Sequence, residues 1–274
     1  MLRPPHSRYL RIFIYHLDHP ELPPIHDPDL IGAWREGETT VLFFHRAKDE
    51  LIKGICGRIG CSVVYEADMD YRDWENGSEI SPFVVGPLRI APIWDFAEGD
   101  IVLDPSVIFG NGFHPTTRLC LEALVNLADE QGPFHSALDL GCGTGILGIA
   151  AAGLGVKEVV ATDENTLAVQ VARANIARNS AGKQVRVVRQ DLALSCPLTR
   201  GVDLVMVNLF HDLLAGLFTS PEFWQARYYI ISGFFEAREK ELMVFLPLER
   251  FDMLDRVIRD KWGCWLLAQK NKQI

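Results

Sequence analysis

A glycine-rich turn between two short apolar runs is the part of this chain best suited to bind a small ligand. The run 137–140 is followed by Gly141-Cys-Gly143-Thr-Gly145, and the next apolar run ends at Asp163, 22 positions after Gly141. Glycines let the backbone approach a ligand closely, and a carboxylate about 20 residues later is placed to hold ribose hydroxyls. The spacing therefore predicts a ligand that contains a nucleoside.

The spacing of the glycines distinguishes between two classes of nucleoside cofactor. A nicotinamide enzyme needs G-x-G-x-x-G directly after its first strand, but position 146 is Ile, so the pattern fails when counted from Gly141. Residues 139–145 instead resemble the D-x-G-x-G-x-G motif of Rossmann-like S-adenosylmethionine-dependent methyltransferases. The following helix N-terminus favours the carboxylate of a methionine tail, and an acid such as Asp139 suits its cationic groups.

Strands and helices alternate from about residue 119, as in a parallel sheet covered on both faces. The apolar patterns predict strands at 136–140, 158–163, 185–191, 202–208 and 228–232, and helices at 119–127, 146–154, 167–179 and 236–245. Segments 251–258 and 264–267 flank a Lys-Trp-Gly turn, which predicts a closing antiparallel hairpin.

The first 65 residues predict a separate small α+β domain. Segments 8–17, 39–45 and 61–65 have the β-branched and aromatic content of strands, and 48–59 carries a helical apolar stripe. The proline-rich segment 20–28 is expected to be a loop. We assign residues 1–65 to this domain, 66–100 to a linker and lead-in strands, and 101–274 to the cofactor-binding domain.

Charge limits the partners. The formal net charge is −9, with a pI near 5.4, which disfavours direct nucleic-acid binding and favours a basic protein partner.

The cysteines and the apolar runs limit the metal content and the location. The six scattered cysteines predict unpaired thiols, and Cys56 and Cys61 lack the second pair of ligands that a zinc site needs. No metal site is expected. The apolar runs are too short for a signal peptide or a membrane span, so a cytoplasmic protein is expected.

A second motif lies upstream of the glycine turn. Residues 103–118 read L-D-P-S-V-I-F-G-N-G-F-H-P-T-T-R, and they closely resemble the L-D-P-x-x-x-F-G-x-G-x-H-P-T-T run of the ribosomal protein L11 methyltransferases (PrmA family). The resemblance covers roughly residues 66–270, whereas residues 1–65 match only in coarse strand–helix order. It implies an α/β, Rossmann-like class I methyltransferase core with a mostly parallel seven-stranded sheet and a closing antiparallel hairpin. A small α+β N-terminal domain would grip the protein substrate.

The resemblance also implies roles for the positions that match the family's motifs. The residues expected to contact or shape the S-adenosylmethionine site are Phe109, Thr117, Gly141, Gly143, Gly145, Asp163 at the ribose, Asp191 at the adenine amine, and Asn208 where donor and acceptor meet. Structural alternatives remain open: the two aspartates could cap turns, Thr117 could cap a helix, and Phe109 could be ordinary core. His114, before a proline, is interpreted as a turn residue rather than a base.

Asn208 is the candidate catalytic residue. It ends an almost wholly apolar strand, where an amide needs hydrogen-bond partners, and the carboxyl end of a parallel strand faces the binding crevice. A lysine amine, with a pKa of ~10.4, is mostly protonated at neutral pH, and a neighbouring carboxylate would stabilise the ammonium further. A neutral amide oxygen can orient the amine by a hydrogen bond and stabilises its protonated form less than a carboxylate does. Positioning and desolvation would then do most of the catalysis.

The sequence therefore predicts methyl transfer from S-adenosylmethionine to a lysine ε-amine or an N-terminal α-amine of a protein of the ribosomal L11 type. Ser106 stands where the family usually has glycine, and Leu-Phe-His-Asp follows Asn208 where small residues are usual, so a bulkier acceptor wall is expected. The alternatives are another protein, such as an electron-transfer flavoprotein lysine, a small amine, a non-catalytic cofactor-binding module, or a nicotinamide dehydrogenase.

Overall fold

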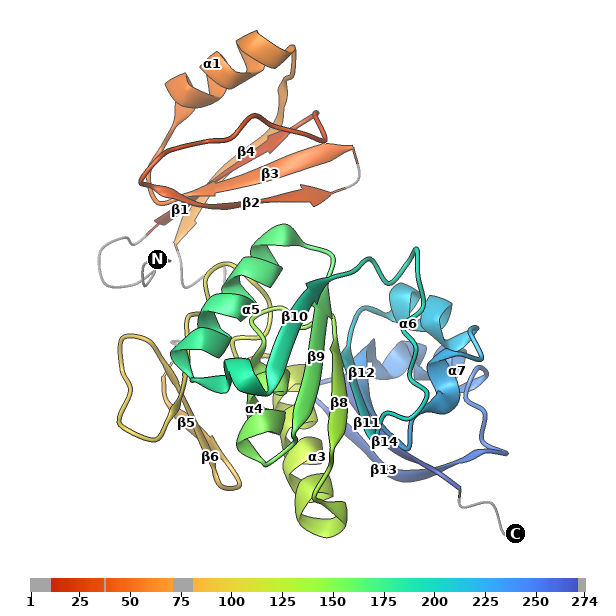
Figure 1. The fold of residues 1–274 in the computed structure, drawn as a ribbon. Helices are drawn as coiled ribbons and strands as arrows, with labels where there is room; N and C mark the ends of the chain where they lie inside the picture. Colours follow the sequence, from red (N-terminus) through yellow and green to blue (C-terminus); the bar gives the residue numbers. More distant parts are fainter. Residues whose placement is uncertain (1–10, 37, 71–80, 271–274) are drawn as a thin grey trace.

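The computed structural model describes residues 11–36, 38–70 and 81–270. Within them the chain forms a four-stranded, a three-stranded and a seven-stranded sheet (Figure 1). The N-terminal elements are β1 (Arg11–Leu17), β2 (Leu30–Glu36), β3 (Thr39–Phe44), α1 (Asp49–Ile59) and β4 (Val63–Asp70). The lead-in elements are β5 (Phe83–Val85), β6 (Leu88–Pro92), β7 (Ile101–Leu103) and α3 (Pro115–Gln131).

The remaining elements build the larger sheet and its covering helices. Its strands are β8 (Ser136–Leu140), β9 (Glu158–Asp163), β10 (Val185–Arg189), β11 (Leu204–Asn208), β12 (Tyr228–Phe235), β13 (Phe251–Arg259) and β14 (Trp262–Gln269). The helices are α4 (Ile146–Gly153), α5 (Thr166–Arg178), α6 (His211–Phe218) and α7 (Glu239–Met243), with short 3₁₀ turns η1 (Ala181–Lys183), η2 (Phe223–Gln225) and η3 (Glu236–Arg238).

Strand order places the ligand site. The larger sheet runs β10-β9-β8-β11-β12-β14-β13; the first five strands are parallel, and β14 is antiparallel to both of its neighbours, β12 and β13. This confirms the expected mostly parallel seven-stranded sheet with its closing hairpin. Successive strands β8, β9 and β10 proceed to one side, whereas β11 returns to the other side of β8. In such sheets ligands bind outside the carboxyl ends of the strands at this point of reversal.

Helices cover both faces of the sheet because its central strands are apolar on both sides. β11 buries Leu204, Val205, Met206 and Val207 completely. One buried cluster joins residues of α3, α4 and α5 to one face, and a second joins residues of α6, α7 and η2 to the other. None of the described helices is long and apolar enough to cross a bilayer.

The N-terminal sheet has two buried faces, as the alternation of side chains along a strand requires. Along β1, Tyr15 and Leu17 pack under α1, whereas Ile12 and Ile14 belong to a different cluster. That cluster includes Val107 and Ile108 of the upstream motif and Leu167, Ala168 and Val171 of α5. The N-terminal sheet therefore packs directly against the segment that leads into Phe109.

The N-terminal elements agree with the sequence pattern in part. The strand over 39–45 and the helix over 48–59 are present as β3 and α1, and β2 was not anticipated. β4 continues to Asp70, so it crosses the boundary expected at residue 65. Residues 71–80 of the expected linker lie outside the described residues, and the division into three segments stays a prediction.

Candidate active site

The glycine turn and Asp163 meet at the carboxyl ends of β8 and β9. The Gly143 amide donates to Asp163 Oδ2 at 3.0 Å, and the Asn165 amide donates to Asp163 Oδ1 at 2.9 Å. These bonds fix the carboxylate beside the turn, while burial raises its pKa above the usual range. Asp163 thus supports the start of α5 and at the same time borders the turn, so the two interpretations from the sequence are compatible.

Two of the glycines have a positive φ and lie directly against other parts of the site. Gly141 has φ +71°, and a Cβ there would lie 2.2 Å from Leu209 Cδ2. Gly143 has φ +52°, and a Cβ there would lie 2.3 Å from the Phe109 carbonyl oxygen. Gly145 is the N-cap of α4. The turn is therefore held between the residue after β11 and the upstream motif, and it brings the two sequence motifs together.

A buried asparagine, not anticipated from the sequence, ties these motifs to each other. Asn175 on α5 accepts from the Asp104 amide at 2.8 Å, and its Nδ2 donates to the carbonyls of Asp104 and Thr144, both at 3.0 Å. Thr144 in turn donates from Oγ1 to the Gly110 carbonyl at 2.6 Å, and from its amide to the Phe109 carbonyl at 3.1 Å. An asparagine within the apolar stripe of a helix is the signal that could have identified it.

Ser106, which stands where the family usually has glycine, has a backbone conformation typical of glycine. Its φ is +49°, in the left-handed region that glycine adopts most easily. The backbone at this position therefore keeps the conformation that favours glycine, although the residue is a serine.

The first turn of α3 holds Thr117. His114 is the N-cap, with Nδ1 accepting from the Thr116 amide at 3.4 Å, and Pro115 occupies the first helical position. His114 therefore caps the helix, and the alternative of Thr117 as its cap is wrong. Thr117 is 1% exposed, and its Oγ1 has no hydrogen-bond partner. A buried hydroxyl without a partner costs about 1–3 kcal/mol, which a polar ligand group would recover.

Asn208 ends β11 beside the point of reversal. It lies opposite Ser232 of β12, and the next amide, of Leu209, donates to the Ser232 carbonyl at 3.1 Å. The Asn208 Oδ1 atom is buried and has no hydrogen-bond partner. The end of the strand is thus fixed by backbone bonds, and the amide oxygen stays available as an acceptor.

Asp191 lies two residues beyond the end of β10 and is therefore outside the strand that was expected to contain it. β10 ends at Arg189, so the strand expected over 185–191 is shorter in the structure. The Asp191 Oδ1 atom accepts from the Ala193 amide at 2.8 Å, which is a turn contact. The intervening Gln190 amide donates to the Asp163 carbonyl at 3.0 Å, so Asp191 remains at the same edge of the sheet as Asp163.

Asp139 lies beneath the turn. It is 1% exposed, and its Oδ2 accepts from the Gly148 amide at 2.9 Å, inside the first turns of α4. Burial raises the pKa of Asp139 to about 7. One of its oxygens is thus already used by the helix that follows the glycine turn.

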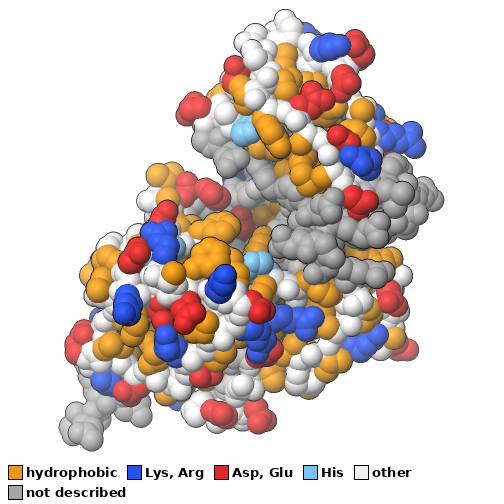
Figure 2. Space-filling model, turned by 180° about the vertical axis from the view of Figure 1, so that it is seen from behind, with side chains coloured by type: hydrophobic (Ala, Val, Ile, Leu, Met, Phe, Trp, Pro, Cys, Tyr) orange, Lys and Arg blue, Asp and Glu red, His pale blue; other side chains and the backbone are white. Residues whose placement is uncertain are grey.

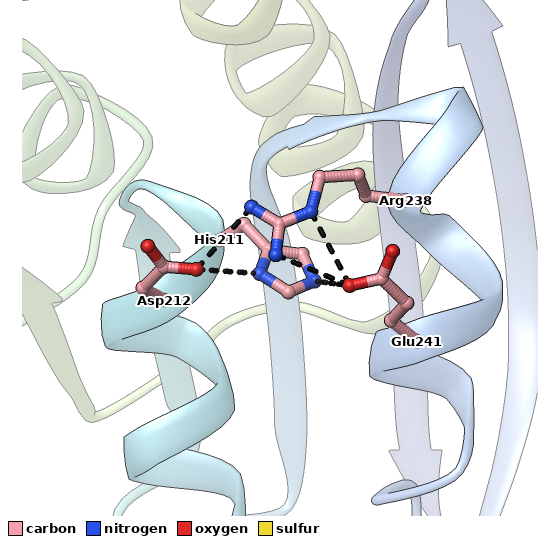
Figure 3. Close-up of polar contacts among 4 residues, drawn as sticks. All are labelled: His211, Asp212, Arg238 and Glu241. Carbon is pink, nitrogen blue, oxygen red and sulfur yellow. Dashed lines mark hydrogen bonds and ion pairs between the residues drawn. The ribbon is translucent and has the colours of Figure 1, made fainter.

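A charged cluster follows Asn208 and was not anticipated as a unit. His211 lies between Asp212 and Glu241, and Arg238 contacts both carboxylates (Figure 3). His211 Nδ1 is 3.0 Å from Asp212 Oδ1. The contacts join the start of α6 to η3 and α7, which holds the segment that leaves β11.

Aromatic side chains remain exposed near this edge. Phe109, Phe210 and Phe235 are 48%, 77% and 46% exposed. Figure 2 shows hydrophobic side chains gathered beside a histidine on the reverse face of the larger unit. Among the residues that the structure describes, no group of three or more His, Cys, Asp or Glu side chains could hold a metal ion.

The residues at the reversal fit the expected S-adenosylmethionine. The glycine turn leaves no room for side chains, Asp163 borders it, and the orphaned Thr117 Oγ1 and Asn208 Oδ1 offer polar contacts that the protein itself does not use. A ligand with a ribose, a carboxylate and a charged amine can satisfy such groups.

Comparisons with known proteins identify relatives of this chain. The profile of the family described as "Ribosomal protein L11 methyltransferase (PrmA)" matches residues 36–270. A ribosomal protein L11 methyltransferase from Thermoanaerobacter sp. (strain X514) is 33% identical over 224 residues, covering 78% of this chain and 70% of the relative. One from Exiguobacterium sp. (strain ATCC BAA-1283 / AT1b) is 32% identical over 228 residues, with the same coverage.

A solved structure supports the fold. The crystal structure of ribosomal protein L11 methylase from Lactobacillus delbrueckii subsp. bulgaricus superposes with a TM-score of 0.60 at 24% identity. It covers 70% of this chain and 100% of the other.

Proposed function

This chain belongs to the ribosomal protein L11 methyltransferase (PrmA) family, and from that premise we propose how its residues divide the reaction. The protein is an S-adenosylmethionine-dependent protein methyltransferase of the L11 type, with a ribosomal protein as its substrate. We infer that the acceptor is a lysine ε-amine or an N-terminal α-amine. The proposed partner is the protein rather than nucleic acid, because a net charge of −9 disfavours phosphate backbones.

The proposed cofactor contacts follow the geometry of the reversal point. Asp163 holds the ribose, while Gly141, Gly143 and Gly145 let the backbone pass beneath the methionine tail. Phe109 packs on the cofactor and Thr117 Oγ1 hydrogen-bonds to it; its lack of a protein partner supports this role. Asp191 is proposed at the adenine amine, supported by its link to Asp163 through Gln190. S-adenosylmethionine supplies an electrophilic methyl group on a sulfonium.

Asn208 Oδ1 is the observation that carries the proposed chemistry. A buried carbonyl oxygen without a donor is unfavourable until a donor arrives. A neutral substrate amine has N–H groups to donate and keeps its lone pair for the methyl carbon. Asn208 therefore orients the amine, and because it carries no charge it does not hold the amine in the ammonium form. The proton that is lost passes to water.

The test is methyl transfer to purified ribosomal protein L11 from labelled S-adenosylmethionine, with cofactor binding measured separately by calorimetry. Asn208→Ala should lower kcat by roughly 100-fold, the scale expected when a reacting group loses its orientation, and should leave cofactor affinity within a few-fold. Asn208→Asp restores an acceptor oxygen but adds a charge, so its activity should recover only at a pH high enough to deprotonate the amine.

Two results would contradict the proposal. Unchanged turnover in Asn208→Ala would remove this residue from the mechanism. Label in a protein other than L11, with none in L11 under the same conditions, would reject the substrate while keeping the chemistry.

A further inference from the structure

Four aromatic rings from distant parts of the chain form a continuous row at the carboxyl edge of the sheet. The centroids of Phe109 and His114 are 5.0 Å apart, and those of His114 and Trp262 are 4.7 Å apart, both edge-to-face. Trp262 then stacks on Phe235, with centroids 3.8 Å apart and planes inclined by 28°. We call these four residues the aromatic row.

The order of the strands places two of the four rings, Phe235 and Trp262, on the acceptor side. The glycine turn follows β8 and Asp163 ends β9, whereas Asn208 ends β11, the strand on the other side of β8. Phe235 and Trp262 lie opposite each other on β12 and β14, beyond β11. Ser232, which pairs with Asn208, precedes Phe235 by three positions, or ~10 Å of strand. Only Phe109 reaches back to the glycine turn.

The two ends of the row are exposed, whereas the inner rings, His114 and Trp262, are partly buried. Phe109 and Phe235 are 48% and 46% exposed, and each aromatic ring left in water forgoes the benefit of burial. The middle ring is held in place, because His114 Nδ1 contacts both the amide and the hydroxyl of Thr116. Burial also lowers the pKa of His114, which favours the uncharged imidazole next to a bound cation.

We propose that the aromatic row is the wall of the acceptor site that binds the amine-bearing side chain as a cation, before methylation as an ammonium and afterwards as an N-methylated ammonium. The inference rests on the proposed amine acceptor, because aromatic faces attract ammonium and quaternary ammonium groups. Trp262, one of the two inner members of the row, is proposed as the main contact because tryptophan is the strongest of the aromatic partners for a cation.

The test uses choline as a trimethylammonium probe and 3,3-dimethylbutan-1-ol as its neutral isostere, with binding to the purified full chain followed by ligand-observed NMR. Choline should bind roughly fivefold more tightly or better, as expected for a cation near several rings. Trp262→Leu should abolish this preference, and Trp262→Phe should keep part of it. Phe235→Leu, a milder change at the end of the row, should weaken choline binding in the same direction.

Leu254→Ala is the control, because Leu254 is 49% exposed on β13 of the same hairpin and lies outside the row. It should leave choline binding unchanged. In methylation assays, Trp262→Leu should raise the KM for L11 by roughly fivefold and leave the Kd for S-adenosylmethionine unchanged.

Equal binding of choline and the alcohol, or an unchanged preference in Trp262→Leu, would overturn the inference. So would a loss of S-adenosylmethionine affinity in Trp262→Leu as large as the change in KM, because the ring would then belong to the cofactor site. The NMR experiment requires no turnover. A protein that binds choline through the row but fails to methylate L11 would reject the proposed substrate and retain the cation-binding wall.

Discussion

Replacing Asn175 with alanine should test whether the two sequence motifs act as one unit. The side chain is fully buried and makes four hydrogen bonds, to Asp104 twice, to Thr144 and to Arg178. Alanine would leave three backbone groups in the interior without this partner: the Asp104 amide and the carbonyls of Asp104 and Thr144. At about 1 kcal/mol each, a low value for an unsatisfied buried group, the free energy of unfolding should fall by about 3 kcal/mol.

The same substitution should weaken cofactor binding. Asn175 connects the segment before Phe109 to the carbonyl of Thr144 within the glycine turn. Without that connection the turn and the upstream motif lose their fixed relation, and ordering them again on binding should lower S-adenosylmethionine affinity by roughly tenfold, or about 1.4 kcal/mol. Urea denaturation and isothermal calorimetry measure the two effects.

Asn179 provides a matched control one turn later, at the C-cap of α5. It accepts from the Val102 amide and donates to the Val102 carbonyl, at 2.7 and 2.8 Å, but it has no contact with the glycine turn. Asn179→Ala should therefore destabilise the protein while leaving cofactor affinity within twofold. If Asn175→Ala and Asn179→Ala change affinity equally, or if neither does, the idea that Asn175 couples the motifs is refuted.

Three further substitutions have distinct expected outcomes. The pKa of Asp139 is raised to about 7 in the folded state, so the native protein binds this proton more tightly than the unfolded chain does. This carboxyl therefore lowers the free energy of unfolding by up to about 1.4 kcal/mol per pH unit from about pH 4 to 7. Asp139→Asn should lack that slope in denaturation series, and the same pH dependence in the variant and the wild type would show the reasoning to be wrong. Gly143→Ala places a Cβ 2.3 Å from the Phe109 carbonyl oxygen at a positive φ, so it should cost at least about 2 kcal/mol by urea denaturation, and wild-type stability would contradict the geometry. Thr117→Val removes a buried hydroxyl that has no partner, so it should raise the free energy of unfolding by up to about 1 kcal/mol. The same change should lower the affinity for S-adenosylmethionine measured by calorimetry. Unchanged affinity would show that Thr117 does not contact the cofactor.

Local patterns predicted most of the larger sheet well. The strands over 136–140 and 158–163 coincide with β8 and β9, because a buried parallel strand is a continuous apolar run between turns. β2 and α6 were missed. β2 has the sequence Leu-Ile-Gly-Ala-Trp-Arg-Glu, whose glycine and alanine weaken the strand pattern. Its place in the sheet is set by pairing with β3.

Local sequence patterns likewise identified some residues of the candidate site and missed others. The glycines, Asp163 and Asn208 could be found from spacing and from the ends of apolar runs, because each is adjacent in sequence to the strand that positions it. The charged cluster around His211 could not be found in this way, since its partner Glu241 lies 30 positions further along the chain. What brings the two together is the packing of α6 against α7.

The sequence by itself determined the class of ligand, because the glycine register and the distance to Asp163 are properties of one strand–turn–helix–strand segment. Only the tertiary structure decided what lies opposite that ligand. The aromatic row joins Phe109 to Trp262 across more than 150 residues, and Asn175 joins α5 to a loop 71 positions earlier. Such contacts depend on strand order and on the packing of helices over the sheet, which no local pattern of side chains specifies.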